Sequence, residues 1–212
     1  MSQMNLDFIK NEEMRNFGNY VITTRPNYFK TSSTRMGKWH PKDEYRPYGN
    51  KKHITRVLRV IEHLITDYEG SPRGTPPLRT LPDDDKALLY LAALIHDINK
   101  STKKASASTG PNVVAQDLHT FFGRGWATKG WTGKLVELVA IHGGAFYPPS
   151  HVNKNIYTYN PADPLHFLLH TADYIASRND INIDTKYRFG GRNWHNPIWW
   201  WSMRAYLWLL FK

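Results

Sequence analysis

A histidine, an aspartate and a lysine close the most regular apolar stretch of the chain. Apolar residues from Leu88 to Ile95 recur at helical spacing and also fill the other face, which is typical of a helix buried on most sides. His96 and Asp97 follow directly, and Lys100 comes three residues later. Packing of a buried helix does not require these polar residues at its end, so we treat them as candidate functional residues.

Two further histidines and an aspartate share one face of a second predicted helix, residues 161–178. His166, His170 and Asp173 are four and three positions apart, so their side chains project from roughly the same side. We expect His170 to point into the same pocket as Asp173, and His166 to support the site or belong to the core. Arg178, beyond Asp173, can orient that carboxylate or bind a substrate phosphate.

Three segments, in this order, resemble the signature of the HD-domain metal-dependent phosphohydrolases. They are KKHITRVLRVIEHL with His53, HDINK with His96 and Asp97, and LLHTADYIASR with Asp173. The resemblance covers residues 51–178. It implies an all-α fold, a single HD-domain helical bundle with a central metal pocket. It also implies that these two histidines and two aspartates are the metal ligands.

The resemblance further implies roles for residues around this ligand set. Asp97 and Lys100 are expected to be catalytic, with the lysine ammonium stabilising charge on a transferred phosphoryl group and binding substrate. His142, at the end of a predicted helix, matches a position where HD proteins frequently hold a phosphate-binding or second-metal histidine. It can equally bind the last carbonyl groups of its own helix. Family members often carry another histidine where this chain has residues 110–112, GPN, which argues against a second metal.

The donor atoms of the implied ligand set narrow the choice of cation. Two imidazoles and two carboxylates form a mixed nitrogen and oxygen site, and the chain has no cysteine, which excludes thiolate ligands and disulfides. Such a site suits Mn, Fe, Co, Ni or Zn, and less exclusively Mg. The sequence does not choose among these ions.

Other helices and loops must position these segments. Helical patterns cover residues 5–17, 51–68, 111–122, 132–142, 161–178 and 197–211. Residues 18–50 lack helical periodicity and interleave basic with aromatic side chains. This composition suits either a long segment whose aromatic side chains pack on the core or a loop that binds a phosphate backbone. We predict an N-terminal extension packed on the domain (1–50), an HD domain (51–180) and a C-terminal loop with an apolar helix (181–212).

Composition predicts one folded domain with a substantial core. The 212 residues are 41% hydrophobic and 14% aromatic. No basic leader precedes an apolar core at the start, and the most hydrophobic segment, residues 198–211, is shorter than the about 20 residues needed to cross a bilayer. We expect a cytoplasmic protein without a membrane span. The apolar C-terminal helix would pack inside the domain or against a second copy of the chain.

The net charge of +10 predicts anionic partners, both nucleotides and nucleic acids. The first hypothesis is a phosphohydrolase acting on nucleotides, which removes phosphate from deoxynucleoside monophosphates or triphosphate from deoxynucleoside triphosphates. The second is a phosphodiesterase or nuclease acting on cyclic dinucleotides or single-stranded nucleic acid, favoured by the charge and by residues 18–50. The third is a non-catalytic nucleotide-binding protein that retains the ligand set.

Overall fold

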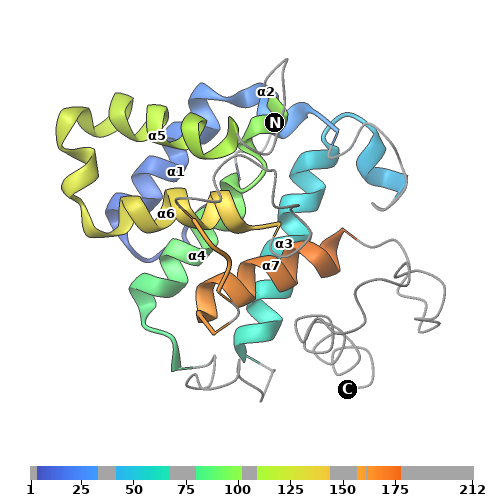
Figure 1. Ribbon diagram of the computed structural model, residues 1–212. Coiled ribbons are helices and arrows are strands. Elements are labelled where there is room, and N and C mark those ends of the chain that lie inside the picture. Colours follow the sequence, from blue (N-terminus) through green and yellow to red (C-terminus); the bar gives the residue numbers. More distant parts are fainter. Residues whose placement is uncertain are drawn as a thin grey trace.

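The computed structural model describes residues 4–32, 42–66, 80–101, 109–143, 157–160 and 162–177. Within these ranges the protein is all-α, as predicted, with seven α-helices and no strand (Figure 1). The α-helices are α1 (Glu12–Thr24), α2 (Pro26–Lys30), α3 (Gly49–Thr66), α4 (Asp83–Ile95), α5 (Thr109–Phe122), α6 (Gly130–Ile141) and α7 (Pro164–Ala176). Three short 3₁₀ helices are η1 (Lys42–Tyr45), η3 (Ile98–Ser101) and η4 (Gly123–Thr128).

Helix α4 forms the centre of the core. All its residues from Ala87 to Ile95 are buried, and it packs against α1, α3, α6 and α7. Three aspartates in its first turn favour this start because they lie at the positive end of the helix dipole. Beyond Ile95 the chain turns at His96 and Asp97 and continues as η3, with the amide of Lys100 donating to the carbonyl of Asp97 at 2.8 Å.

The N-terminal part differs from the prediction of a helix over residues 5–17 that loses its order at Gly18. Helix α1 begins later, runs through Gly18 and is followed at once by α2. Gly18 lies where α1 approaches α4, and a Cβ atom there would come within 2.8 Å of the Leu6 side chain and 3.4 Å of the Leu94 side chain. Close packing of α1 against α4 therefore requires a glycine at this position.

Helices α3 and α7 make the most extensive helix–helix contact and cross one another in Figure 1. The buried residues of α3 form the predicted apolar stripe, which includes Ile54, Val57, Ile61 and Leu64. The side chain of Asp163 caps α7 by accepting hydrogen bonds from the backbone amides of Leu165 and His166, in the first turn of the helix. Both helices lie close to their predicted ranges, 51–68 and 161–178.

The remaining layer consists of α5, η4 and α6. Gly123, at φ 70°, ends α5 as predicted, because glycine adopts this left-handed conformation without a Cβ clash. In the part of the chain that the structure describes, no helix is long and apolar enough to cross a membrane. Residues 178–212, which include Arg178 and the predicted apolar C-terminal helix, lie outside the described residues.

Candidate metal centre

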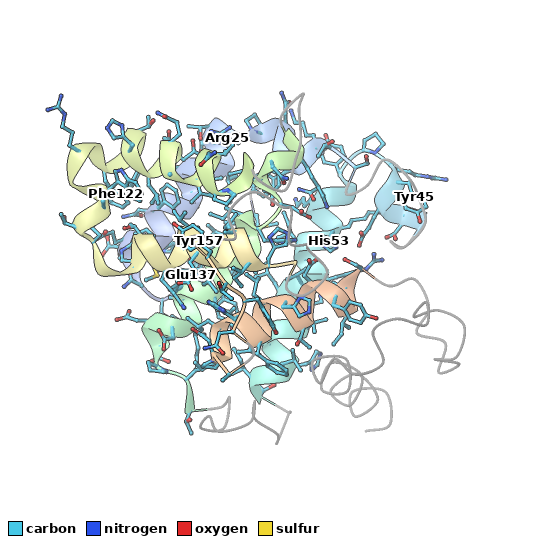
Figure 2. The ribbon with its side chains drawn as sticks, viewed as in Figure 1. Arg25, Tyr45, His53, Phe122, Glu137 and Tyr157 are labelled. Atoms are coloured by element: carbon cyan, nitrogen blue, oxygen red, sulfur yellow. The ribbon has the colours of Figure 1, made fainter. Side chains whose placement is uncertain are left out.

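The side chains of His53, His96 and Asp97 meet where α3 faces the end of α4. Both histidines are fully buried, and Asp97 is 8% exposed. The two Nε2 atoms lie 3.3 Å apart, and Oδ2 of Asp97 lies 3.2 Å from that of His96 and 3.8 Å from that of His53. Figure 2 shows His53 projecting from α3 into the middle of the helices. These three residues form a buried group that could hold a metal ion.

Asp173 reaches the same place from α7. Its Oδ1 lies 3.0 Å from Nε2 of His53 and 3.6 Å from Nε2 of His96. The hydroxyl of Ser177, one turn later, donates to the same oxygen at 3.3 Å. The structure thus brings together all four side chains that the HD resemblance implied as ligands, although they come from three different helical segments.

The hydrogen bonds behind the histidines define which ring atom faces the centre. Nδ1 of His96 donates to the carbonyl of Ala93 at 2.8 Å, and Nδ1 of His142 donates to that of Val139 at 2.7 Å. Because a carbonyl only accepts, the neutral ring then presents a lone pair at Nε2. These lone pairs face Asp97, whose ionised oxygens also only accept. Converging acceptors need a proton or a cation between them, and this donor set fits a divalent cation.

Glu44 completes the surroundings of His53 and was missed by the sequence analysis. It belongs to η1, is fully buried, and places Oε2 3.5 Å from Nδ1 of His53, on the far side of the ring from the centre. Arg56 donates to its other oxygen. A carboxylate behind a ligand imidazole fixes the ring orientation and its tautomer.

The backbone around η1 brings Glu44 this close to α3. A Cβ atom at Gly49 would lie 1.8 Å from the carbonyl oxygen of Glu44, so only glycine allows this approach. In the sequence, Glu44 lies in a polar stretch without periodicity, and its one signal is that it precedes the His53 helix by a short distance. Nothing local in the sequence distinguishes it from a solvated glutamate.

The carboxylates of the centre are held in their ionised form. Burial opposes ionisation of Asp97, but the charge of Lys100 helps hold its pKa well below the ordinary value. Burial also opposes ionisation of Asp173, whose pKa is lowered by the hydrogen bond with His53. Burial alone would lower the pKa of His53, yet Asp173 and Glu44 outweigh it and raise that pKa to about 9. The centre therefore attracts positive charge.

The remaining predicted site residues surround this centre. Lys100 donates from η3 to Asp97, and its side chain is 25% exposed, so its ammonium lies at the edge of the centre. Nε2 of His142 lies 3.8 Å from Oδ1 of Asp97, while its Nδ1 binds the carbonyl of its own helix end as one of the two predictions had it. Its phosphate-binding or second-metal role stays a prediction. Nδ1 of His170 lies 3.1 Å from the carbonyl oxygen of His142. Burial lowers the pKa of both histidines.

Of the two other predicted residues, one lies outside the described residues and the other belongs to a different cluster. Arg178 lies outside the described residues, so its role stays a prediction. His166 faces away from the centre, where its Nε2 lies 3.0 Å from Glu137 and 3.1 Å from the ammonium of Lys134. The expected common face of α7 is therefore divided between two different clusters.

No protein-family model, no curated protein and no solved structure matches the chain.

Proposed function

We propose that the protein is a metal-dependent phosphohydrolase of the HD-domain type that acts on nucleotides. The observation that carries this proposal is the convergence of two imidazole Nε2 atoms, from His53 and His96, with the carboxylates of Asp97 and Asp173. The HD resemblance of the sequence implies the same four residues as ligands. Agreement between an ordered sequence pattern and a buried spatial cluster supports the assignment.

The donor set supports a divalent cation as cofactor. It offers two nitrogens and at least two oxygens without sulfur, which suits Mn, Fe, Co, Ni or Zn and also accommodates Mg. When bound, the cation supplies Lewis acidity, which lowers the pKa of water and polarises a phosphoryl group. Glu44 and the carbonyl of Ala93 would keep the rings of His53 and His96 turned towards it.

The neighbouring residues have chemical roles that their positions support. Lys100, beside Asp97 at the edge of the centre, stabilises negative charge on the transferred phosphoryl group. An oxygen of Asp97 or Asp173 accepts a hydrogen bond from the attacking water and so orients it. His142, which borders Asp97, and His170, which lies behind His142, are proposed to support substrate binding, together with Arg178.

Nucleotides are the proposed substrates because the net charge of +10 favours anions and because a compact centre suits a small phosphate ester. The proposed reaction releases phosphate from deoxynucleoside monophosphates or triphosphate from deoxynucleoside triphosphates. The second candidate is a phosphodiesterase or nuclease acting on cyclic dinucleotides or a single strand. It is favoured by the basic outer face of α3, where Lys51, Lys52, Arg56 and Arg59 line one hollow.

Product analysis tests the proposal directly. The purified protein is incubated with deoxynucleoside mono- and triphosphates, cyclic dinucleotides and a short single strand, with Mn, Co and Mg in separate reactions. We expect a nucleoside with phosphate or triphosphate, absent with Asp97→Ala and retained with the control Asp163→Ala. Cleavage confined to cyclic dinucleotides or the strand would favour the second candidate. The absence of product from every substrate would contradict the proposed hydrolase activity and favour a non-catalytic nucleotide-binding protein.

A further inference from the structure

The outer face of α3 carries an open hollow of about 440 Å³. Its lining includes Lys51, Lys52, Arg56 and Arg59, with Tyr48 at the preceding turn and Asp43 from η1. On a helix of 3.6 residues per turn, positions 52, 56 and 59 share one side, roughly a third of a turn away from the side that carries the buried positions 53, 57 and 64. The hollow therefore belongs to the solvent side of the helix whose inner side carries His53.

Positive charge exceeds negative charge in this hollow. Arg56 is held between Asp43 and the buried Glu44, so it forms a fixed part of the wall. Lys52 lies 3.5 Å from Asp43, but both side chains are about half exposed, and such surface pairs contribute little and exchange readily. Arg59 is exposed one turn further along the helix. An incoming anion thus meets two exposed cations, Lys52 and Arg59, next to an anchored one.

The spacing of these cations favours a chain of phosphates over a single small anion. The basic stripe extends from Lys51 to Arg59, and a helix rise of about 1.5 Å per residue makes it about 12 Å long. A single phosphate group covers only part of such a length. Successive phosphates along a strand can use the whole stripe, as in grooves that follow a nucleic-acid backbone.

Tyr48 adds an aromatic surface at the start of this stripe. The residue is 39% exposed, and its backbone has φ 67°, a conformation that is uncommon for residues other than glycine. Its amide donates to the carbonyl of Lys30 at 2.8 Å, which ties the turn to the end of α2. The fold thus holds an aromatic ring beside cations, and a base can stack on such a ring irrespective of its sequence.

We propose that the outer face of α3 is a docking site for single-stranded nucleic acid, with phosphates bound by Lys51, Lys52 and Arg59 and a base stacked on Tyr48. This inference concerns binding and goes beyond the proposed hydrolysis of nucleotides. It holds whether or not the metal centre cuts the strand.

Fluorescence anisotropy with a labelled single strand of about ten nucleotides tests the site. The full chain is titrated in EDTA, where metal-dependent hydrolysis makes no contribution, at several salt concentrations. We expect log K to fall linearly with log salt, by about 0.7 for each phosphate contact. Lys52→Ala and Arg59→Ala should each weaken binding and reduce the slope by about 0.7, because each removes one contact.

The aromatic contact has a different signature. Tyr48→Asn keeps a residue type that tolerates positive φ but removes the ring. It should weaken binding about tenfold at every salt concentration and leave the slope unchanged, since stacking releases no counterions. Tyr48→Phe, which keeps the ring, should bind like the wild type.

Arg124→Ala is the matched control for loss of one exposed positive charge. Arg124 belongs to η4, next to Phe122, and Figure 2 shows Phe122 on the opposite side of the molecule from Tyr45 beside the hollow. Its removal should leave affinity and slope nearly unchanged. Equal losses from Arg124→Ala and Arg59→Ala would overturn the proposal, because net charge alone would then account for binding.

Two further outcomes would also overturn the site. One is the absence of strand binding at low salt. The other is displacement of the strand by free deoxynucleoside monophosphate at matched phosphate concentration, which would indicate a small-anion site. The docking site and the proposed function can fail separately. If the protein binds the strand with the expected variant pattern but hydrolyses no nucleotide, the docking site is supported and the proposed function is contradicted.

Discussion

Helix α7 contributes to a cluster of histidine and carboxylate side chains towards each end, and the two clusters arrange their charges differently. Towards the C-terminal end, Asp173 lies beside His53 and His96, and the Nε2 atoms of these two histidines are 3.3 Å apart. At the N-terminal end, Asp163 and His166 face the side chains of α6. We call these the metal-centre cluster and the lysine cluster.

The lysine cluster supplies its own cation. The ammonium of Lys134 lies 2.7 Å from Asp163 and 3.2 Å from Glu137, and Figure 2 shows Glu137 on α6. Nδ1 of His166 accepts the amide of Asn160 at 3.1 Å, and its Nε2 lies 3.0 Å from Glu137. Each carboxylate thus has a cation or an N–H donor within the cluster, which is a stable arrangement without any added ion.

The metal-centre cluster instead directs ring nitrogens and carboxylate oxygens towards one point in its middle. Lys100 lies at its edge and binds one oxygen of Asp97, while the Nε2 atoms of His53 and His96 face carboxylate oxygens from two helices. The comparison teaches that a buried histidine next to a carboxylate does not by itself indicate a metal site. What the metal-centre cluster adds is the convergence of ligand atoms on one point, which could hold a metal ion.

The largest expected difference between the two clusters is the effect of a substitution in each on the metal-induced rise in Tm. A cation at about a hundredfold over its Kd stabilises the folded state by about 2.7 kcal/mol, which raises the Tm by about 5–10 °C for a chain of this size. We expect Asp97→Ala to abolish the Mn-induced rise. His166→Ala should lower the starting Tm yet keep the rise. A rise that persists in Asp97→Ala, or disappears in His166→Ala, would contradict the distinction.

The carboxylates behind the two histidines provide a matched pair of substitutions. Glu44→Gln keeps the side-chain shape behind His53 but removes its charge, so we expect metal affinity to fall about tenfold or more. Glu137→Gln makes the same change behind His166 and should leave metal affinity unaltered. Isothermal titration calorimetry with Mn measures both. Equal Kd values for the two variants would show that Glu44 does not position His53 for metal binding.

Loss of Asp163 should affect the fold without affecting the metal. Its side chain accepts the amides of Leu165 and His166 at the start of α7 and pairs with Lys134. Asp163→Ala removes both contacts, and we expect the free energy of unfolding to fall by about 1–2 kcal/mol. Asp163→Asn keeps a capping oxygen and should lose less. Denaturant titration measures the change, and a reduced Mn affinity in either variant would show that the clusters are coupled.

The sequence predicted the parts of the centre that carry a local pattern. His96 and Asp97 follow a buried helix, and Asp173 lies in a helical segment that resembles a family motif, so each could be identified from its neighbours. Glu44 has no such pattern, because its burial depends on the approach of η1 to α3. His166 was placed on the correct face of α7, but spacing along one helix does not specify which neighbouring helix each turn meets.

The smallest expected effect is an acid-dependent loss of stability from the lysine cluster. Burial opposes ionisation of Asp163, but the hydrogen bond from Lys134 and the nearby His166 hold its pKa below the ordinary value of 3.8. Because the folded-state pKa is the lower one, the stabilisation is fully present above the unfolded-state value of about 3.9. It is lost as pH falls through the folded-state pKa.

This contribution should be under about 1 kcal/mol, since Asp163 is partly exposed and its ion pair is screened by solvent. Thermal unfolding in EDTA between about pH 5 and pH 2.5 measures it. We expect the decline in Tm at acid pH to be shallower for Asp163→Asn than for the wild type. The metal-centre carboxylates remain in both proteins, so the difference between the two curves isolates the lysine cluster. Superimposable curves would mean that Lys134 gives Asp163 no net stabilisation, and that the cluster is held by capping and packing alone.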